Sequence, residues 1–154
     1  MTRPRRILVA TDFSPDARAA YESALSLSGR TGAQVDVVYV WQPPEGVPLT
    51  TQAPRAGSRA LSDLARAEAM RGLRHLVGGS GAHPRMEIGI PHEVLVTLAA
   101  SERFDLLLMG ATGHGREPRG VGSVTRRVLD VAPCPVLTLR STTTSPRAEA
   151  GVAS

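Results

Sequence analysis

The sequence predicts an α/β fold in which helices cover both faces of a five-stranded parallel, Rossmann-like sheet. Short apolar runs rich in β-branched residues alternate along the chain with longer segments whose apolar residues recur at helical spacing. The apolar runs are nearly continuous, which is typical of strands that are buried on both faces. Right-handed crossovers then bring the carboxyl ends of the strands to one edge, where doubly wound sheets bind their ligands.

The first strand is expected over residues 7–10, and the loop after it leads into a helix. Ser14 is a good N-cap, and Pro15 suits the first helical position. Gly32 marks the end of this helix, because glycine adopts the left-handed conformation of a C-cap without strain. The second strand follows over residues 35–41.

A Pro- and Gly-rich connection over residues 42–58 is long for a compact domain, and we expect it to be a lid or a mobile segment. Apolar spacing predicts an amphipathic helix over residues 60–76, which the glycines of residues 78–81 end. The third strand is expected over residues 86–90 and the third helix over residues 91–102.

The last two strands are expected over residues 105–109 and 136–139, with a helix from about Val124 between them. The chain after residue 140 is rich in Ser, Thr and Ala and lacks periodicity. We therefore expect residues 141–154 to form a disordered tail.

The loop from Gly110 to Ser123 carries the strongest functional signal. It places five glycines between a buried strand and a helix start. A strand that leads through glycines into a helix directs backbone N–H groups at an anion, and glycine lets the ligand approach without meeting a Cβ. Ser123 stands at the predicted N-cap, where its hydroxyl serves either the helix or a phosphate oxygen.

Composition excludes several classes of function. All eighteen basic residues are arginine, so a Schiff-base lysine and a phosphate-loop NTPase are both excluded. A dinucleotide site is disfavoured because no glycine fingerprint follows the first strand. The net charge is +4, but the arginines are scattered and aromatic residues make up 3% of the chain, so we expect no nucleic-acid partner.

We expect no membrane partner either, since no apolar run approaches the roughly 20 residues of a membrane span and no signal-peptide core is present. The single cysteine, Cys134, excludes an internal disulfide framework and favours a reducing cytoplasm. The four histidines have no metal-ligand spacing. Enzymatic activity stays undecided, and Asp12 is the one candidate base.

From Ile7 to Arg140 the chain resembles the small single-domain universal stress proteins. The resemblance is carried by the opening ILVATDFSPDARAAYESALSLSGRTGAQVDVVYVW, the Gly89-Ile-Pro91 turn and the segment LLLMGATGHG…VGSVTRRVLDVAPCPVLTLR. It implies a domain over residues 1–140 and the strand order 3-2-1-4-5 of adenine nucleotide alpha hydrolase-like proteins. It also implies a homodimer that pairs through the last strand, Val136–Leu139.

Nucleotide-binding members carry Gly, two residues, Gly, nine residues, Gly and then Ser or Thr. Gly110, Gly113 and Gly122-Ser123 match this motif, although eight residues rather than nine separate Gly113 from Gly122. The resemblance implies that the cofactor is ATP, with Mg²⁺ held through its phosphates. The implied contacts are Thr11, Asp12, Val40, Met109, Gly110, Gly113, His114, Gly115, Gly122, Ser123, Val124 and Thr125.

By this resemblance Asp12 lies near the ribose or a phosphate-bound Mg²⁺, where it would at most support slow ATP hydrolysis, and the backbone of Val40 meets the adenine. Each residue also has a structural alternative: Asp12 as a local turn acceptor, Val40 and Met109 as core, Ser123 as an N-cap and Thr125 as an ordinary helix residue. Two hypotheses therefore stand. One is a dimeric, ATP-binding regulatory protein of the stress response with a protein partner yet to be identified. The other is a dimeric interaction or chaperone-like stress protein that binds no nucleotide.

Overall fold

A computed structural model describes residues 3–45, 56–113 and 120–141 of the chain. It contains five parallel strands in the order β3-β2-β1-β4-β5, as the sequence and the resemblance predict. The elements are β1 (Arg6–Ala10), α1 (Pro15–Thr31), β2 (Gln34–Trp41), α2 (Ala56–Val77), β3 (His83–Ile88), α3 (Pro91–Ser101), β4 (Leu106–Gly110), α4 (Ser123–Val131) and β5 (Val136–Leu139). No helix in these described parts is long and apolar enough to cross a membrane.

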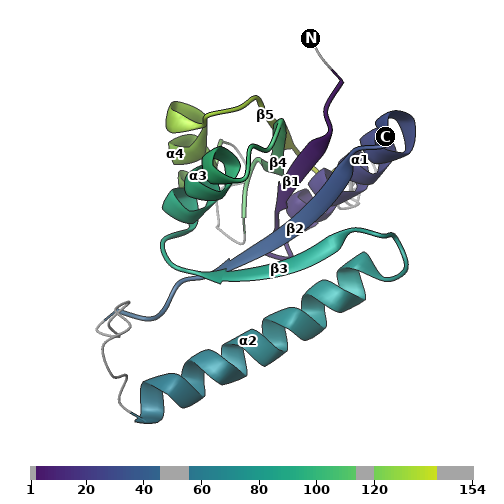
Figure 1. Ribbon diagram of the computed structural model, residues 1–154. Coiled ribbons are helices and arrows are strands. Elements are labelled where there is room, and N and C mark those ends of the chain that lie inside the picture. Colours follow the sequence, from purple (N-terminus) through teal and green to yellow (C-terminus); the bar gives the residue numbers. More distant parts are fainter. Residues whose placement is uncertain (1–2, 46–55, 114–119, 142–154) are drawn as a thin grey trace, which may run out of the picture.

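The sheet is sandwiched between two pairs of helices (Figure 1). On one face α1 and α2 bury small and branched side chains against β1 and β2, including Ala20, Ala24 and Leu73. On the other face α3 and α4 pack through Leu95 and Val128. Because both faces are covered, the central strands β1 and β4 are buried almost throughout, which explains their continuous apolar sequences.

The termini of α1 agree with the capping residues predicted from sequence. The Ser14 hydroxyl accepts a hydrogen bond from the amide of Ala17, Pro15 begins the helix, and Gly32 ends it at a φ of 75°. The prediction of Ser123 as an N-cap is wrong, because the N-cap of α4 is Gly122 and Ser123 is the first helical residue. An N-cap requires an extended backbone, and here that conformation falls one residue earlier.

The predicted boundaries of two further elements are wrong. Helix α2 begins at Ala56 rather than at residue 60, since its first turn lacks the large apolar residues that reveal helical periodicity. Strand β3 covers His83–Ile88 rather than residues 86–90, because its half-exposed start shows no apolar run and Ile90 is already the N-cap of α3. Of the long connection predicted over residues 42–58, residues 46–55 lie outside the described residues, as do residues 142–154 of the predicted tail.

Candidate functional site

The turn between β1 and α1 is built from side chains that bond to the backbone next to them. The Thr11 hydroxyl accepts a hydrogen bond from the amide of Phe13 at 3.0 Å, and Asp12 Oδ1 accepts one from the amide of Ser14 at 2.9 Å. These bonds hold Phe13 at a φ of 63°, a left-handed conformation that is costly for a residue with a Cβ. The turn therefore fixes the position of Asp12 just beyond the carboxyl end of β1.

Two glycines at the end of β4 allow this turn to approach closely. A Cβ at Gly110 would lie 2.9 Å from the amide nitrogen of Ala17, so the start of α1 packs directly on the strand. A Cβ at Gly113 would lie 2.5 Å from Asp12 Oδ2. Gly110 is thus required by backbone packing, whereas a side chain at Gly113 would displace the Asp12 carboxylate.

The chain returns from the glycine loop against the end of β4. The amide of Gly122 donates to the carbonyl of Ala111 at 2.7 Å, and the buried Thr125 hydroxyl donates to the carbonyl of Gly110 at 2.8 Å. These two bonds hold the first turn of α4 beside β4. The first turn of α4, with the positive end of the helix dipole, consequently lines the same space as Asp12.

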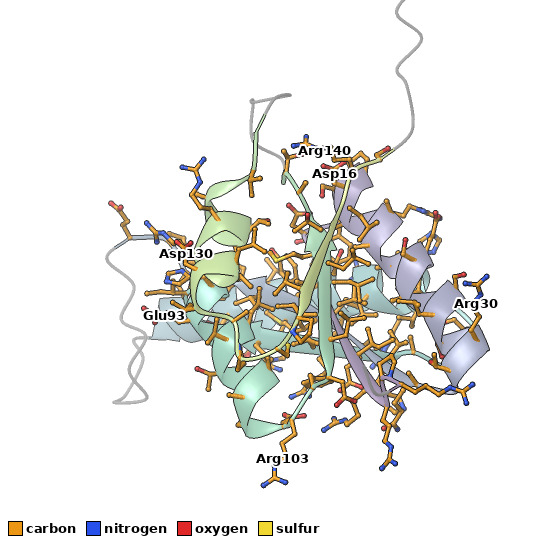
Figure 2. The ribbon with its side chains drawn as sticks, turned by 90° about the horizontal axis from the view of Figure 1, so that it is seen from above. Asp16, Arg30, Glu93, Arg103, Asp130 and Arg140 are labelled. Carbon is orange, nitrogen blue, oxygen red and sulfur yellow. The ribbon has the colours of Figure 1, made fainter. Side chains whose placement is uncertain are left out.

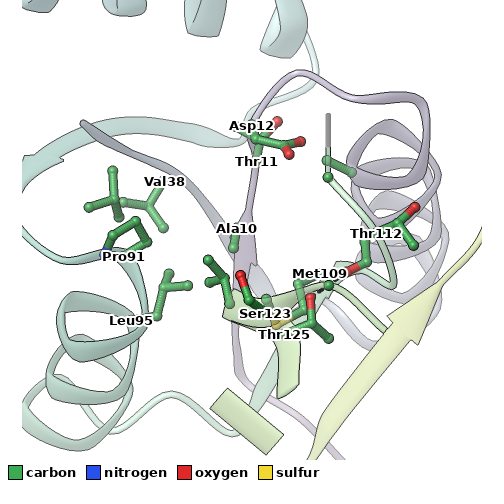
Figure 3. Close-up of a pocket in the computed structure, with 16 residues that line it drawn as sticks. Ala10, Thr11, Asp12, Val38, Pro91, Leu95, Met109, Thr112, Ser123 and Thr125 are labelled. Atoms are coloured by element: carbon green, nitrogen blue, oxygen red, sulfur yellow. Dashed lines mark hydrogen bonds between the residues drawn. The ribbon is translucent and has the colours of Figure 1, made fainter. Parts of the chain in front are cut away.

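This space is a cavity of about 230 Å³ at the carboxyl edge of the sheet (Figure 3). Every predicted site residue that the structure describes lines it. These are Thr11, Asp12, Val40, Met109, Gly110, Gly113, Gly122, Ser123, Val124 and Thr125. The remaining two predicted residues, His114 and Gly115, lie outside the described residues.

The sequence reasoning missed part of the cavity wall. The missed lining residues are Ala10, Ala17, Val38, Pro91, Leu95 and Thr112. Figure 3 shows Val38, Pro91 and Leu95 together on the side of the cavity opposite Thr112. Pro91 could have been found, since it follows β3 and so reaches the same edge as the other strand ends. Leu95 lies about one helical turn further along α3, and nothing but its spacing from Pro91 could have indicated it.

The cavity is apolar on one side and polar on the other. Among its described residues Asp12 is the sole ionisable side chain, and the other polar groups are hydroxyls and backbone amides. The described residues contain no cluster of three or more acidic, histidine or cysteine side chains that could hold a metal ion by themselves. An ion here would therefore need further oxygen ligands in addition to Asp12.

A second polar cluster, the amino-edge network, lies at the opposite ends of the strands. Asp36, which is 5% exposed, accepts a hydrogen bond from Arg85 at 3.2 Å and lies 3.8 Å from Arg6. Arg85 also makes two hydrogen bonds to Glu102, at 2.7 and 2.8 Å, and Asp105 accepts from the amides of Arg5 and Arg6. The hydrogen bonds from Arg85 hold the pKa of Glu102 below its ordinary value.

Comparisons with known proteins agree with this fold. A universal stress protein of Methanocaldococcus jannaschii is 31% identical over 143 residues, which cover 88% of this chain and 82% of the relative. The solved structure of the universal stress protein UspA from Lactobacillus plantarum superposes with a TM-score of 0.69 at 32% identity and covers 91% of this chain and 100% of its own. A universal stress protein in complex with cAMP has a TM-score of 0.67 at 21% identity, covers 92% and 100% of the two chains, and shows the fold alone.

The family model of the universal stress proteins matches residues 4–140. This match includes all five strands and every described residue of the cavity. The chain therefore belongs to the universal stress protein family.

Proposed function

We propose that this chain is an ATP-binding regulatory protein of the stress response that acts as a dimer. The observation that carries the proposal is the cavity at the carboxyl edge, which joins an apolar wall to a wall of glycine backbone, hydroxyls and a single carboxylate. Open parallel sheets bind nucleotides at this edge, near the point where the strand order reverses, and here that point lies between β1 and β4.

The apolar wall suits the adenine ring. Val38 and Val40 come from β2, and Pro91 and Leu95 from the start of α3, so the ring would be held between two elements. The backbone of Val40 would bond to the edge of the base. The cavity volume of about 230 Å³ is below the roughly 300–1,000 Å³ of pockets that enclose a drug-sized ligand. We infer that it encloses the base and ribose, while the phosphates extend along the glycine loop.

The glycine wall suits the phosphates. The amides of Ser123, Val124 and Thr125 belong to the first turn of α4, where four N–H groups lack partners within the helix and the dipole favours negative charge. The hydroxyl of Thr125 already donates its proton to Gly110, so its contribution to phosphate binding would come from its amide. Ser123 is exposed and is the hydroxyl donor of this wall.

Asp12 supports the binding of Mg²⁺ together with ATP rather than alone. Mg²⁺ in nucleotide sites takes one or two carboxylates and completes its octahedral shell with phosphate oxygens and water. A Cβ at Gly113 would lie 2.5 Å from Asp12 Oδ2, so glycine lets the loop pass close to that carboxylate. Asp12 would hold the metal ion beside the phosphates or, without metal, contact the ribose.

We infer a homodimer through Val136–Leu139 because β5 is an edge strand whose side chains are less buried than those of β1 and β4. Leu137 is 42% exposed there, and a second copy that paired with β5 would cover both its side chain and its free backbone groups. We also expect a protein partner, yet to be identified, whose binding depends on whether nucleotide is bound. The single cysteine suits the cytoplasm, where thiols remain reduced.

The direct test is to denature the purified protein and to chromatograph the released small molecules. We expect ATP or ADP in the supernatant or, where the preparation is nucleotide-free, a rise of the melting temperature with Mg-ATP. If no nucleotide is released and ATP, ADP and AMP all leave the melting temperature unchanged, the alternative stands: a dimeric chaperone-like stress protein that binds no nucleotide.

A further inference from the structure

Asp16 connects two segments that are far apart in the sequence. It belongs to the first turn of α1 and does not line the cavity. Its Oδ2 accepts hydrogen bonds from the hydroxyl of Thr112 at 2.6 Å and from the amide of Thr112 at 3.2 Å. Its Oδ1 accepts from the amide of Ser141 at 2.6 Å. A single carboxylate therefore holds the start of the glycine loop and the residue where the chain leaves β5.

Arg140 makes a second connection of the same kind. Its guanidinium donates to the carbonyl of Gly120 at 2.8 Å, where the chain returns from the glycine loop. Figure 2 shows Asp16 and Arg140 beside each other, where β5 ends and α1 begins. The two described flanks of the loop, Thr112 and Gly120, are thus both attached at the exit of β5.

Backbone hydrogen bonds complete the connection between this exit and the cavity. The amide of Ala111 donates to the carbonyl of Leu139 at 2.8 Å, and the carbonyl of Ala111 accepts from Gly122 at 2.7 Å. Thr112 and Gly122 line the cavity, whereas Leu139 and Ser141 do not. A ligand that orders Thr112 and Gly122 would therefore also act on the end of β5.

The carboxylate form of Asp16 is the form that accepts all three bonds. Burial by itself would raise the pKa of Asp16, but the hydrogen bonds from Ser141 and Thr112 outweigh it, so its pKa lies below the ordinary value. The group is consequently ionised at neutral pH. Asn in its place would present an amide donor to one of these donors and lose at least one bond.

We propose that Asp16 and Arg140 are positioning residues that couple the nucleotide cavity to the exit of β5. ATP binding then stabilises the hydrogen bonds at this exit, and these hydrogen bonds strengthen ATP binding. The inference rests on the proposed ATP binding. It adds a route by which occupancy of the cavity reaches the edge strand, which is where a second copy or another partner would pair. Because coupling between two sites is reciprocal, a change at the exit of β5 must alter the affinity for ATP.

The test compares Ser141→Pro with Ser141→Ala in the full chain. Proline removes the N–H that bonds to Asp16. Proline also restricts the preceding residue, Arg140, to extended backbone, which is the conformation expected where a strand ends. Alanine removes the hydroxyl but keeps the N–H, so it is the matched control. The readouts are the dissociation constant of Mg-ATP by calorimetry, the hydrogen exchange of the Ala111 amide and, in the proteins that keep an N–H at residue 141, the exchange of that amide.

In the wild type and in Ser141→Ala, we expect ATP to slow exchange at both amides. Ser141→Pro should bind ATP at least about fivefold more weakly than Ser141→Ala, within the usual range of coupling between sites. Asp16→Asn should weaken binding in the same way, and the amide of Thr112 or of Ser141, whichever faces the NH₂ group of Asn, should exchange faster than in the wild type. Circular dichroism checks that each variant is folded. Asp130→Asn, on the exposed face of α4, removes one negative charge as Asp16→Asn does and is the control for that charge.

The outcomes separate the two proposals. If the wild type binds no ATP, the proposed function itself fails. If the wild type binds ATP and Ser141→Pro binds it as tightly as Ser141→Ala, the coupling is absent and ATP binding stands. If Ser141→Pro does not fold, Arg140→Ala takes its place: equal affinity to the wild type together with an unchanged exchange response would overturn the coupling.

Discussion

The two edges of the sheet place charged and polar groups in opposite ways. At the amino edge, Asp36, Arg85 and Glu102 satisfy one another through hydrogen bonds and ion pairs. At the carboxyl edge, the cavity joins an apolar wall to a wall of glycine backbone and hydroxyls around a single carboxylate, Asp12. Figure 2 places Asp16 and Arg140 at one end of the sheet and Arg103 at the other.

This difference separates a stabilising cluster from the proposed binding site. The groups of the amino-edge network bond to one another, so the network rigidifies the ends of the strands and offers little to a ligand. At the carboxyl edge, the first turn of α4 lines a cavity. Charge density alone would point to the amino edge rather than to the proposed site. Substitutions at the two edges should therefore separate stability from nucleotide binding.

The largest effect on binding is expected for Gly113→Val. Its Cβ would meet Asp12 Oδ2 at 2.5 Å, and the added methyl groups would fill the space beside the phosphates. At ATP concentrations about 100 times the dissociation constant the wild type gains about 2.7 kcal/mol of stability. The variant should gain none in a thermal-shift titration. Gly79→Val is the control, because no atom lies within 4 Å of a Cβ there. Binding that survives Gly113→Val would refute the placement of the loop.

At the amino edge, Arg85→Met should lower the free energy of unfolding by about 2 kcal/mol, because buried Asp36 loses a close partner while Arg6 and His83 remain near it. Urea denaturation measures this loss. The affinity for ATP should stay unchanged, since Arg85 lies outside the cavity. Arg18→Met, which removes an exposed pair with Glu22, is the control and should cost well under about 1 kcal/mol. An ATP affinity that fell with Arg85→Met would break the separation of the two edges.

Thr125→Val should cost about 1 kcal/mol of stability, because the hydrogen bond to the carbonyl of Gly110 is lost inside a buried contact. This bond fixes α4 beside β4, so the affinity for ATP should fall as well. Thr125→Ser keeps the hydroxyl and should restore the affinity in the same calorimetric titration. Failure of serine to restore it would mean that shape rather than the hydrogen bond positions α4.

The smallest effect is the part of the dependence of stability on pH that comes from the amino edge, in addition to the part that comes from Asp16. Glu102 and Asp105 have pKa values below their ordinary values of 4.5 and 3.8, the first through Arg85 and the second through the amides of Arg5 and Arg6. Their contribution is complete above those ordinary values and is lost as the pH falls through the lower pKa values of the folded state. Urea midpoints measured between about pH 7 and pH 3 should show this fall, and Arg85→Met should reduce it. Equal slopes in both proteins would contradict the role of Arg85.

The sequence predicted the strand order through the resemblance and the carboxyl-edge residues through their place after apolar runs. Local chemistry sufficed at Ser14 and Gly32, where capping is decided within a few residues. It failed at Ser123, because the helix start depends on how the loop returns to Ala111. The sequence reasoning missed the amino-edge network altogether. Its residues come from β1, β2, β3 and α3 and meet through the register of the sheet, which no local sequence pattern indicates.

The central claim is that the carboxyl edge, and not the amino edge, binds an adenine nucleotide. An amide NMR titration of the full chain with Mg-ATP tests this claim most directly, because it follows amide signals from both edges in one experiment. We predict saturable shifts at Gly110, Gly113 and Val124, with Asp36 and Arg85 unmoved. Shifts confined to the amino edge, or no shifts at millimolar Mg-ATP, would contradict it.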